Sequence, residues 1–444
     1  MSRGNNSILT YPLTNIFRFL LVSLNIDTIL QESTIRARRE KLSKMIDGLG
    51  LPDVYGATIQ RIKAQGGDKS RLGMAALMWI GHAEQPLRVD ELCHALAIEL
   101  GSMDFNVDNV PSVSTLVSCC QGLIAVDKEG SPVRPIHPTL QRYLSARPDI
   151  FSRPHSAMAE VCLAYLNSWH VKAISADPSP DILNAPFLEY CSAYWGVHAK
   201  KELSDCARSL ALKLLGEYDG HISSKLLLSQ AQHLYVEDFS VNFRFNGLHC
   251  ASLFGIVEVA YALIQREIYD INDGDFGGYT PLTWAARNGH DEMVKMLLGW
   301  ETVNPDKPDN SGQTPLWHAA WRGHEGVVKM LLGWHGANPD HPNRAGATPL
   351  SGAARNGHEG VVRILLAREE VDPDKQNHVG VTPLSYAARG GHEEVVKLLL
   401  GREEVNPNKR DNHGQIPLMF AARYGHNRVT ELLQAHEAVT NSTI

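Results

Sequence analysis

Residues 382–400 read TPLSYAARGGHEEVVKLLL, and the C-terminal half of the chain repeats this stretch with small changes. A Pro-Leu step recurs every 34 residues, each time with Gly-His eight residues after the proline. The residues before the five prolines are Thr280, Thr314, Thr348, Thr382 and Ile416. A fixed period of this kind indicates a repeat architecture, in which units too short to bury a core alone stack side by side. The pattern therefore favours a long recognition surface over one deep catalytic pocket.

Each unit contains the signals of two helices. The four threonines are structural caps, because their hydroxyls can accept a hydrogen bond from the first helical turn and the next position suits proline. The glycine of each Gly-His pair supplies the left-handed residue that stops this first helix. An apolar face at helical spacing, such as Met293 to Leu298, predicts the second helix. A segment rich in Pro, Asp and Asn then closes the unit.

In this order, Thr-Pro-Leu, Ala-Ala, Gly-His and Val-Val-Lys-x-Leu-Leu resemble the ankyrin repeat, at about one residue more than its usual length. Subtracting one period places a degenerate first unit that starts at Leu248 and stops at Gly255. We therefore predict a six-repeat ankyrin α-solenoid over residues 242–440. In the last unit Ile416 replaces the capping threonine and the second helix becomes more polar, as expected of a terminal repeat that faces water.

Composition limits the classes of protein to which the chain can belong. It has 444 residues, of which 43% are hydrophobic and 20% charged, which predicts more than one folded domain and little disorder. A net charge of −7 makes the chain no attractor for nucleic acid or membranes. Seven cysteines without a C-x-x-C pair indicate neither a disulfide framework nor a zinc cluster. A reducing compartment, and therefore a cytoplasmic location, fits this cysteine usage.

The N-terminal half is expected to be helical as well. Residues 1–49 predict two amphipathic helices, and Arg18, Asn25 and Asp27 interrupt the first one too early for a membrane span. Residues 50–150 predict a winged helix, with three helices followed by a β-hairpin. The predicted elements are the helices 72–80, 90–100 (capped by Asp90) and 111–122, and the strands 123–127 and 133–136. Residues 151–241 predict a helical spacer with helices at 156–169, 186–201, 203–218 and 222–235.

The segments GLPDVY (50–55), LMWI (77–80), PLRVDELCHAL (86–96) and Ile136-His137 with Tyr143-Leu144 resemble the winged-helix region of fungal NACHT-type NOD-like receptors. The same module is associated with GPI inositol-deacylase winged helices. In such receptors a nucleotide-binding module precedes the winged helix, and a histidine at the place of His137 senses the nucleotide. No Gly-Lys dipeptide occurs in this chain, so a phosphate-binding loop is absent and we expect no cofactor. His137 is then expected to pack at the corner between wing and helix.

Enzymatic signatures are absent from the sequence, so we expect no enzyme, no catalytic residues and no metal site. Neither G-x-S-x-G nor H-E-x-x-H occurs. The five histidines of the Gly-His pairs lie in successive repeats, roughly 10 Å apart at normal helix packing distances. Zinc ligands must converge on one ion. These histidines are instead expected to start the second helices and to bond neighbouring turns.

Variation between the repeats indicates where a partner binds. Trp284, Trp317 and Trp321 lie on or beside first helices, which the ankyrin resemblance places on the concave face, and tryptophan is enriched in binding hot spots. The alternative is that some of them fill gaps between repeats. Trp321 is the strongest exposed candidate, because four other repeats hold arginine at the equivalent position: Arg287, Arg355, Arg389 and Arg423. This column could pair with acidic or phosphorylated partners, unless acids such as Asp309, Glu370 and Glu404 balance it.

The sequence therefore predicts a mainly α protein that recognises other proteins without catalysis. The receptor resemblance implies the sensor or adaptor half of a NACHT-ankyrin protein in signalling or non-self recognition. Protein ligands on the ankyrin surface, and an upstream NACHT protein or homologue, are the expected partners. One alternative is a truncated gene model of a complete ATP-dependent switch. Another is a DNA-associated regulator, although residues 112–121 of the winged helix lack the Lys and Arg that such readers need.

Overall fold

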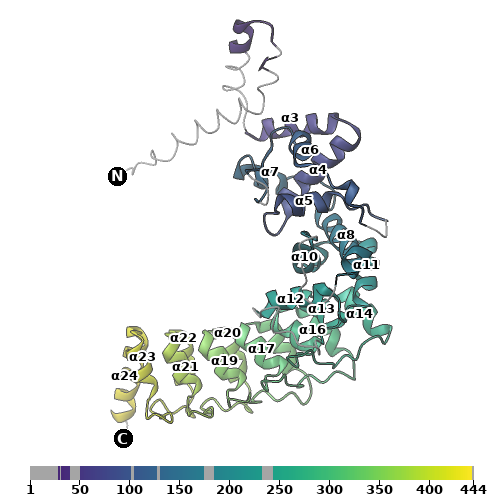
Figure 1. The fold of residues 1–444 in the computed structure, drawn as a ribbon. Coiled ribbons are helices and arrows are strands. Elements are labelled where there is room, and N and C mark those ends of the chain that lie inside the picture. Colours follow the sequence, from purple (N-terminus) through teal and green to yellow (C-terminus); the bar gives the residue numbers. More distant parts are fainter. Residues whose placement is uncertain are drawn as a thin grey trace, which may run out of the picture. The chain divides into compact units, whose positions relative to one another are not determined.

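The computed structural model describes residues 29–30, 32–40, 51–101, 105–127, 131–174, 185–232 and 244–442. The described chain is mainly helical, which confirms the predicted fold class, and it divides into two compact units (Figure 1). The first unit holds residues 1–210 and 225–233, and the second holds 211–224 and 234–444. Of the two predicted N-terminal helices, only residues 29–30 and 32–40 are described, and 35–40 are helical.

The first unit begins with a winged-helix arrangement. Its elements are α3 (Leu51–Ala64), α4 (Gly67–His82), α5 (Val89–Leu96), the 3₁₀ helix η1 (Val107–Asn109), α6 (Val113–Cys119), β1 (Ile124–Ala125), β2 (Arg134–Pro135) and α7 (Pro138–Ser145). The two strands pair antiparallel, with Ile124 opposite Pro135, and Arg88 adds a bridge to Pro132. Proline has no amide N–H to donate to the ladder, and the second strand is only two residues long, shorter than predicted.

The predicted start and end of the second winged-helix helix are wrong. The helix α5 has Arg88 at its N-cap, Asp90 lies inside its first turn, and the helix ends at Leu96 rather than near 100. The N-cap N–H of Arg88 donates to the carboxylate of Glu91 at 2.7 Å, and Asp90 accepts the neighbouring Glu91 N–H at 3.0 Å. A carboxylate three residues into the helix therefore replaces the expected cap.

The remainder of the first unit packs around an aromatic core. Here the helices are α8 (Pro154–Asn167), α9 (Trp169–Lys172), α10 (Leu188–Lys201), α11 (Asp205–Leu215) and α12 (Ile222–Gln232), of which α11 and α12 contain residues of both units. The helix α10 packs along α8. Phe187, Tyr190 and Trp195 are fully buried in this core, and Tyr194 is partly buried.

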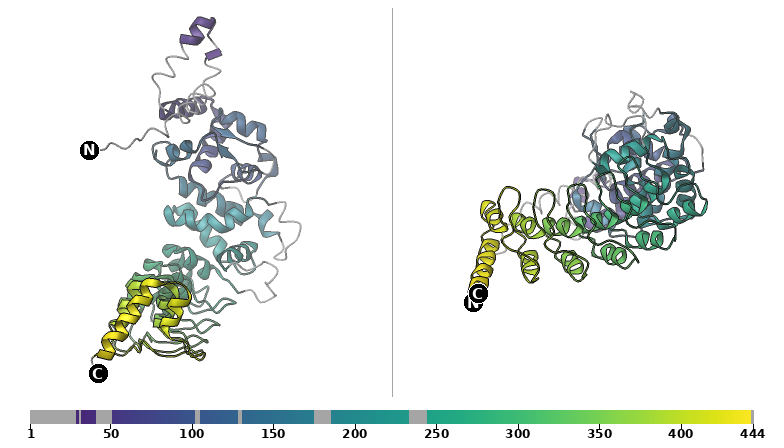
Figure 2. Two further views of the ribbon diagram at one scale, coloured as in Figure 1. Left: turned by 90° about the vertical axis from the view of Figure 1, so that its left-hand side faces the viewer. Right: turned by 90° about the horizontal axis from the view of Figure 1, so that it is seen from below.

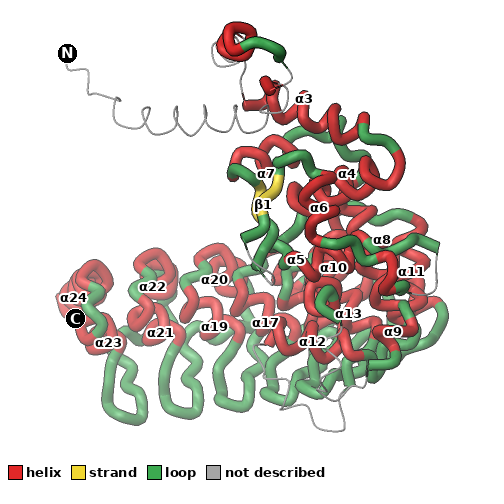
Figure 3. The backbone as a smooth tube through the Cα atoms, turned by 45° about the horizontal axis from the view of Figure 1, so that its top comes forward, coloured by secondary structure: helices red, strands yellow, loops and turns green. Residues whose placement is uncertain are grey.

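The second unit contains six helix pairs in sequence order. They are α13 (Gly247–Phe254) with α14 (Val257–Gln265), α15 (Pro281–Arg287) with α16 (Asp291–Leu298), α17 (Pro315–Arg322) with α18 (Glu325–Leu332), α19 (Pro349–Asn356) with α20 (Glu359–Leu366), α21 (Pro383–Gly390) with α22 (Glu393–Leu400), and α23 (Pro417–Arg423) with α24 (Asn427–Ser442). Successive pairs lie side by side (Figure 2). The long loops between pairs project along one edge of this stack (Figure 3).

The same small contacts build every unit of the stack. Each capping threonine accepts a backbone N–H three residues later, as Thr348 does from Ser351 at 3.2 Å, whereas Ile416 offers no side-chain acceptor. The glycine of each Gly-His pair is left-handed, and Gly357 has φ +74°. Each histidine bonds a carbonyl of the preceding repeat, for example His358 Nε2 to Trp321 O at 2.9 Å. This confirms the prediction that these histidines connect neighbouring turns.

Candidate functional site: a notch between the third and fourth repeats

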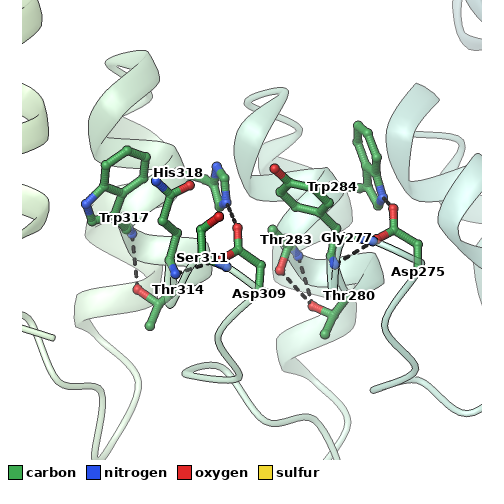
Figure 4. Close-up of polar contacts among 12 residues, drawn as sticks. Asp275, Gly277, Thr280, Thr283, Trp284, Asp309, Ser311, Thr314, Trp317 and His318 are labelled. Carbon is green, nitrogen blue, oxygen red and sulfur yellow. Dashed lines mark hydrogen bonds and ion pairs between the residues drawn. The ribbon is translucent and has the colours of Figure 1, made fainter. Parts of the chain in front are cut away.

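In the second, third and fifth repeats, a side chain at the tip of the long loop reaches back to the first helix of the same repeat. Asp275 Oδ2 accepts the indole N–H of Trp284 at 3.1 Å, and Asp309 Oδ2 accepts from His318 Nε2 at 2.9 Å (Figure 4). In the fifth repeat Asn377 Nδ2 donates to the hydroxyl of Tyr386 at 2.8 Å. These three contacts link positions nine residues apart, so they occupy the same place in successive repeats.

The bonded residues are buried, and this burial shifts their protonation. Burial lowers the pKa of His318, although the bond to Asp309 acts in the opposite direction. Its imidazole is therefore neutral at neutral pH and donates Nε2–H to the Asp309 carboxylate. Burial raises the pKa of Asp275 to about 7, even though this carboxyl accepts N–H bonds from Tyr279, Trp284 and Gly277. Both loop acids are thus committed to bonds within their own repeat.

The fourth repeat departs from this pattern at both ends of the contact. Asn343 Oδ1 accepts the loop N–H groups of Ala345 and Ala347 at 2.9 and 3.0 Å, but its Nδ2 has no hydrogen-bond partner among the described residues. Glycine stands at position 352, where the neighbouring repeats carry His318 and Tyr386. The loop amide therefore faces a position without a side chain.

A hollow of about 360 Å³ opens at this point, and we call it the notch. It is lined by Tyr279, Arg287, Gln313, Trp317, His318, Trp321, Arg322, Asn343, Ala345, Ala347, Ser351, Gly352, Arg355 and Tyr386. Three of these residues are arginines, and no Asp or Glu is among them. A Cβ atom on Gly352 would lie 3.4 Å from Trp321 Cε3, so any larger side chain there would meet the tryptophan ring. The glycine therefore leaves this side of the Trp321 ring uncovered at the notch.

The three predicted tryptophans occupy different environments. Trp284 is only 1% exposed and its indole N–H is already bonded, so the prediction that it contacts a partner is wrong, because it fills the gap beside its loop. Trp317 is 6% exposed and stacks on Trp321, with ring centroids 5.0 Å apart and an interplanar angle of 12°. Trp321 is partly exposed at the notch.

The buried indole nitrogen of Trp317 makes no hydrogen bond within the described ranges. In Figure 4 this nitrogen lies on the side of the ring away from His318. The other repeats of the array carry His, Thr, Ser or Met at this position, as in His249 and Ser351. The sequence predicts Trp317 as a partner contact. It could not show that the indole N–H lacks an acceptor, because this depends on how the neighbouring side chains pack.

The predicted arginine column lies over aromatic rings. The guanidinium of Arg355 is 5.2 Å from the ring centroid of Trp321 and 5.7 Å from that of Tyr386. Arg287 similarly covers Tyr279 and Trp284, each at 5.5 Å, and Arg389 covers Tyr424 at 5.3 Å. Arg423 is exposed. Such cation–π contacts restrict where a guanidinium points while they leave its N–H donors free.

Two of the acids that could have balanced the charge of this column, Asp309 and Glu404, pair with other residues. Asp309 bonds His318, and Glu404 pairs with Arg402 at 3.3 Å. Among the described residues, none of the four arginines of the column makes an ion pair. The column therefore keeps its positive charge on the face formed by the first helices, which we call the first-helix face.

One group of side chains in the first unit has the spacing of metal ligands. Candidate ligand atoms of Glu84, His155 and His198 all lie within 4.8 Å of one another. His155 Nδ1 and His198 Nδ1 are 2.9 Å apart, and Tyr190 OH lies 2.9 Å from His198 Nε2. Glu84 is paired with Lys201 at 2.5 Å. The cluster is therefore satisfied by contacts within the protein, and sequence reasoning missed it because its members are far apart in the chain.

Burial lowers the pKa of His198 to about 3, and the neighbouring His155 and Lys201 act in the same direction. The pKa of His155 is lowered as well, mainly by burial and then by Lys201. The two imidazoles are thus neutral at neutral pH. If one of the two Nδ1 atoms carries a proton and the other does not, the two rings share one N–H···N hydrogen bond.

The winged-helix residues that the sequence singled out have structural roles here. His137 is the N-cap of α7, where its Nδ1 accepts the Thr139 N–H at 3.3 Å. The helix α6 carries no Lys or Arg. None of the helices that the structure describes is long and apolar enough to span a bilayer.

Two family models match parts of the chain. A family model described as ankyrin repeats matches three times, over residues 218–309, 301–377 and 350–444. A model described as the winged-helix domain of GPI inositol-deacylase matches residues 60–152.

Two human proteins match short stretches of the chain. The cation channel "Transient receptor potential cation channel subfamily A member 1" is 44% identical over 54 residues, which is 12% of this chain and 5% of the channel. "Ankyrin repeat and SAM domain-containing protein 3" is 43% identical over 51 residues, or 12% of this chain and 8% of that protein. The chain thus spans only a small part of the length of these relatives.

Proposed function

Because the chain belongs to the ankyrin-repeat family, we propose that it binds another protein through the first-helix face of its second to fifth repeats. Ankyrin-repeat architecture is typically non-enzymatic, and we infer that the whole chain acts by recognition rather than catalysis. The observation that carries this proposal is the arginine column, in which guanidinium groups are held over aromatic rings without an ion-pair partner among the described residues. Aromatic residues and arginine are the residue types that dominate binding energy at protein interfaces.

The column also has the geometry of a recognition surface. Arg287, Arg355 and Arg389 occupy the same position in the second, fourth and fifth repeats, with Trp321 at this position in the third, so an extended partner segment would meet these side chains in turn. Each guanidinium rests on a ring of its own or a neighbouring repeat, which reduces the rotamer freedom that binding would otherwise remove. Preorganised donors of this kind favour binding without the need for a deep pocket.

We propose that the N-terminal half connects this recognition surface to a signalling partner. The supporting observations are the winged-helix match over residues 60–152 and the lack of Lys and Arg in α6, which makes that module unsuited to reading DNA. In this proposal residues 50–150 form the winged helix, 151–241 the spacer and 242–440 the array. The chain would act as a cytoplasmic sensor or adaptor of the NACHT type.

Proximity labelling in the native cell tests the recognition surface. Labelled proteins are compared between the wild type, Trp321→Ala and Trp169→Ala, which removes a 59% exposed tryptophan of the first unit. We expect Trp321→Ala to lose a set of partners that Trp169→Ala keeps. Identical labelling by all three proteins would exclude the first-helix face as the binding surface.

Sequencing of transcripts upstream of Met1 tests the connection to NACHT signalling. A continuous reading frame with a phosphate-binding loop would make the chain part of an ATP-dependent switch. A gel-shift assay that showed salt-sensitive DNA binding would instead favour a DNA-associated regulator.

A further inference from the structure

We propose that the notch binds the carboxylate of one Asp or Glu side chain from the partner protein. This inference rests on the proposed function, because it assigns a ligand chemistry to one point of the first-helix face. It goes further in stating that the fourth repeat, and not the array as a whole, selects an acidic residue.

Two unused hydrogen-bond donors carry the first part of the argument. Only 6% of the Trp317 surface is exposed, and its indole N–H has no hydrogen-bond partner within the described residues. The amide of Asn343 keeps both N–H bonds free, whereas the equivalent Asn377 donates to Tyr386. The Trp317 donor is buried and the Asn343 amide is partly buried, and a buried N–H without an acceptor is unfavourable, so a ligand that brings acceptors is favoured at this place.

The charges around the notch carry the second part. Arg287, Arg322 and Arg355 line it, no acidic residue does, and none of the three makes an ion pair in the described chain. Arg355 is held between the rings of Trp321 and Tyr386, which orients its guanidinium in advance. A carboxylate offers two acceptor oxygens that fit a guanidinium in a bidentate pair. An uncharged side chain cannot form such a charge-assisted pair, and a basic side chain would be repelled by the arginines.

The space in the notch carries the third part. In the third and fifth repeats the loop residue bonds a ring on the first helix, through His318 and Tyr386. In the fourth repeat Gly352 provides no such group, and the hollow of about 360 Å³ remains open to an incoming side chain. The partner carboxylate would therefore supply the acceptor that Asn343 lacks within its own repeat.

A pair of matched substitutions separates the notch from general charge effects. Asn343→Asp keeps the oxygen that holds the loop, because the equivalent residues Asp275, Asp309 and Asp411 hold their loops in the same way. It removes the N–H donors and places a negative charge at the notch. Asn377→Asp makes the same change in net charge one repeat further on, outside the notch. Arg355→Gln and Arg423→Gln form a second pair of the same kind.

The probe is a random dodecapeptide library displayed on phage and selected on the purified full chain. We expect the selected peptides to share an Asp or Glu at one position, and synthetic copies to lose affinity about tenfold or more for Asn343→Asp. The same peptides should bind Asn377→Asp and Arg423→Gln within about twofold of the wild type. Thermal unfolding of Asn343→Asp should match the wild type, which shows that the loss does not come from unfolding.

Three outcomes would overturn the proposal. They are selected peptides without a shared acidic residue, peptides that bind Asn343→Asp as tightly as the wild type, and a library that yields no binder at all. A phosphoserine at the selected position that bound more tightly than Glu would reassign the notch from carboxylates to phosphoryl groups. If these results were negative while proximity labelling still depended on Trp321, the recognition function would stand and only the ligand chemistry would be wrong.

Discussion

The two units of the chain use histidine in opposite ways. In the repeats, five histidines make one and the same bond, from Nε2 to a backbone carbonyl of the preceding repeat at 2.8–3.0 Å. In the first unit His198 is fully buried, and its two nitrogens meet two unrelated side chains, His155 and Tyr190. A contact that recurs every 34 residues leaves a signal in the sequence, whereas a contact made once leaves none.

The same substitution should cost different amounts of stability in different repeats, because the cost depends on whether a following repeat packs against the site. Gly357 and Gly425 are both left-handed, at φ +74° and +76°. A Cβ on Gly357 would lie 2.5 Å from Nδ1 of His392, which a hydrogen bond to Arg355 O holds in place, whereas nothing lies within 4 Å of a Cβ on Gly425.

We therefore expect Gly357→Ala to lower the free energy of unfolding by about 3 kcal/mol, through left-handed strain and the clash together. Gly425→Ala should lose only about 1 kcal/mol from the strain. Urea unfolding of both variants measures the difference. Equal losses would show that the histidine ring moves aside freely and that the repeats are less tightly coupled than this geometry indicates.

The histidine pair of the first unit should make that unit sensitive to acid. The pKa of His198 in the folded chain is about 3, below the ordinary value of 6.5, so the unfolded chain binds a proton that the folded chain does not. This contribution to stability is present above pH 6.5 and is lost as the pH falls from 6.5 towards 3. The slope for one group is about 1.4 kcal/mol per pH unit, or about 2 kcal/mol down to pH 5.

Urea unfolding of the wild type and of His198→Gln at pH 7.5 and pH 5.0 checks this. The glutamine cannot take up a proton, so the variant should lose less stability between the two pH values. His155 and His82 also have lowered pKa values and would account for the remaining loss. An identical pH dependence in both proteins would contradict the role assigned to His198.

The threonine caps should contribute equally to the free energy of unfolding in the interior repeats, and the last repeat has no such contribution. Thr348→Ala removes the acceptor for the Ser351 N–H and should cost about 1 kcal/mol, without changing which partner binds. Ile416 offers no such acceptor, so Ile416→Thr should restore one and gain up to about 1 kcal/mol. Thermal unfolding of both variants tests this, and a selective loss of one partner in Thr348→Ala would contradict a purely structural role.

The effect of Trp321 on stability should be modest. It stacks on Trp317 and under Arg355 but remains partly exposed, so Trp321→Ala should cost about 0.5–1.5 kcal/mol from the lost ring contacts. Its effect on partner capture should be much larger than this. A melting temperature lowered as much as in Gly357→Ala would instead place Trp321 among the core residues of the array.

What could be predicted from the sequence follows the same division. The capping threonines, the left-handed glycines and the histidines that join repeats recur along the array. The role of each can be explained from the sequence of a single repeat. Trp284 was misassigned because its burial depends on Asp275, a loop residue whose reach is not visible in the pattern. The notch was missed because it arises from Trp321 in one repeat and Gly352 in the next, and each looks like ordinary variation when taken alone. The Glu84, His155 and His198 cluster depends on tertiary packing throughout.

The bonds between repeats join residues 37 positions apart, always from the Gly-His histidine to the helix before it. Cutting and rejoining the gene at equivalent points of two repeats would preserve every one of these links. Unequal crossing-over can thus lengthen or shorten the array while each junction remains intact. If the notch has the proposed acidic preference, an exchange that separated the third repeat from the fourth would remove this preference, because Trp321 lies in one and Gly352 in the other.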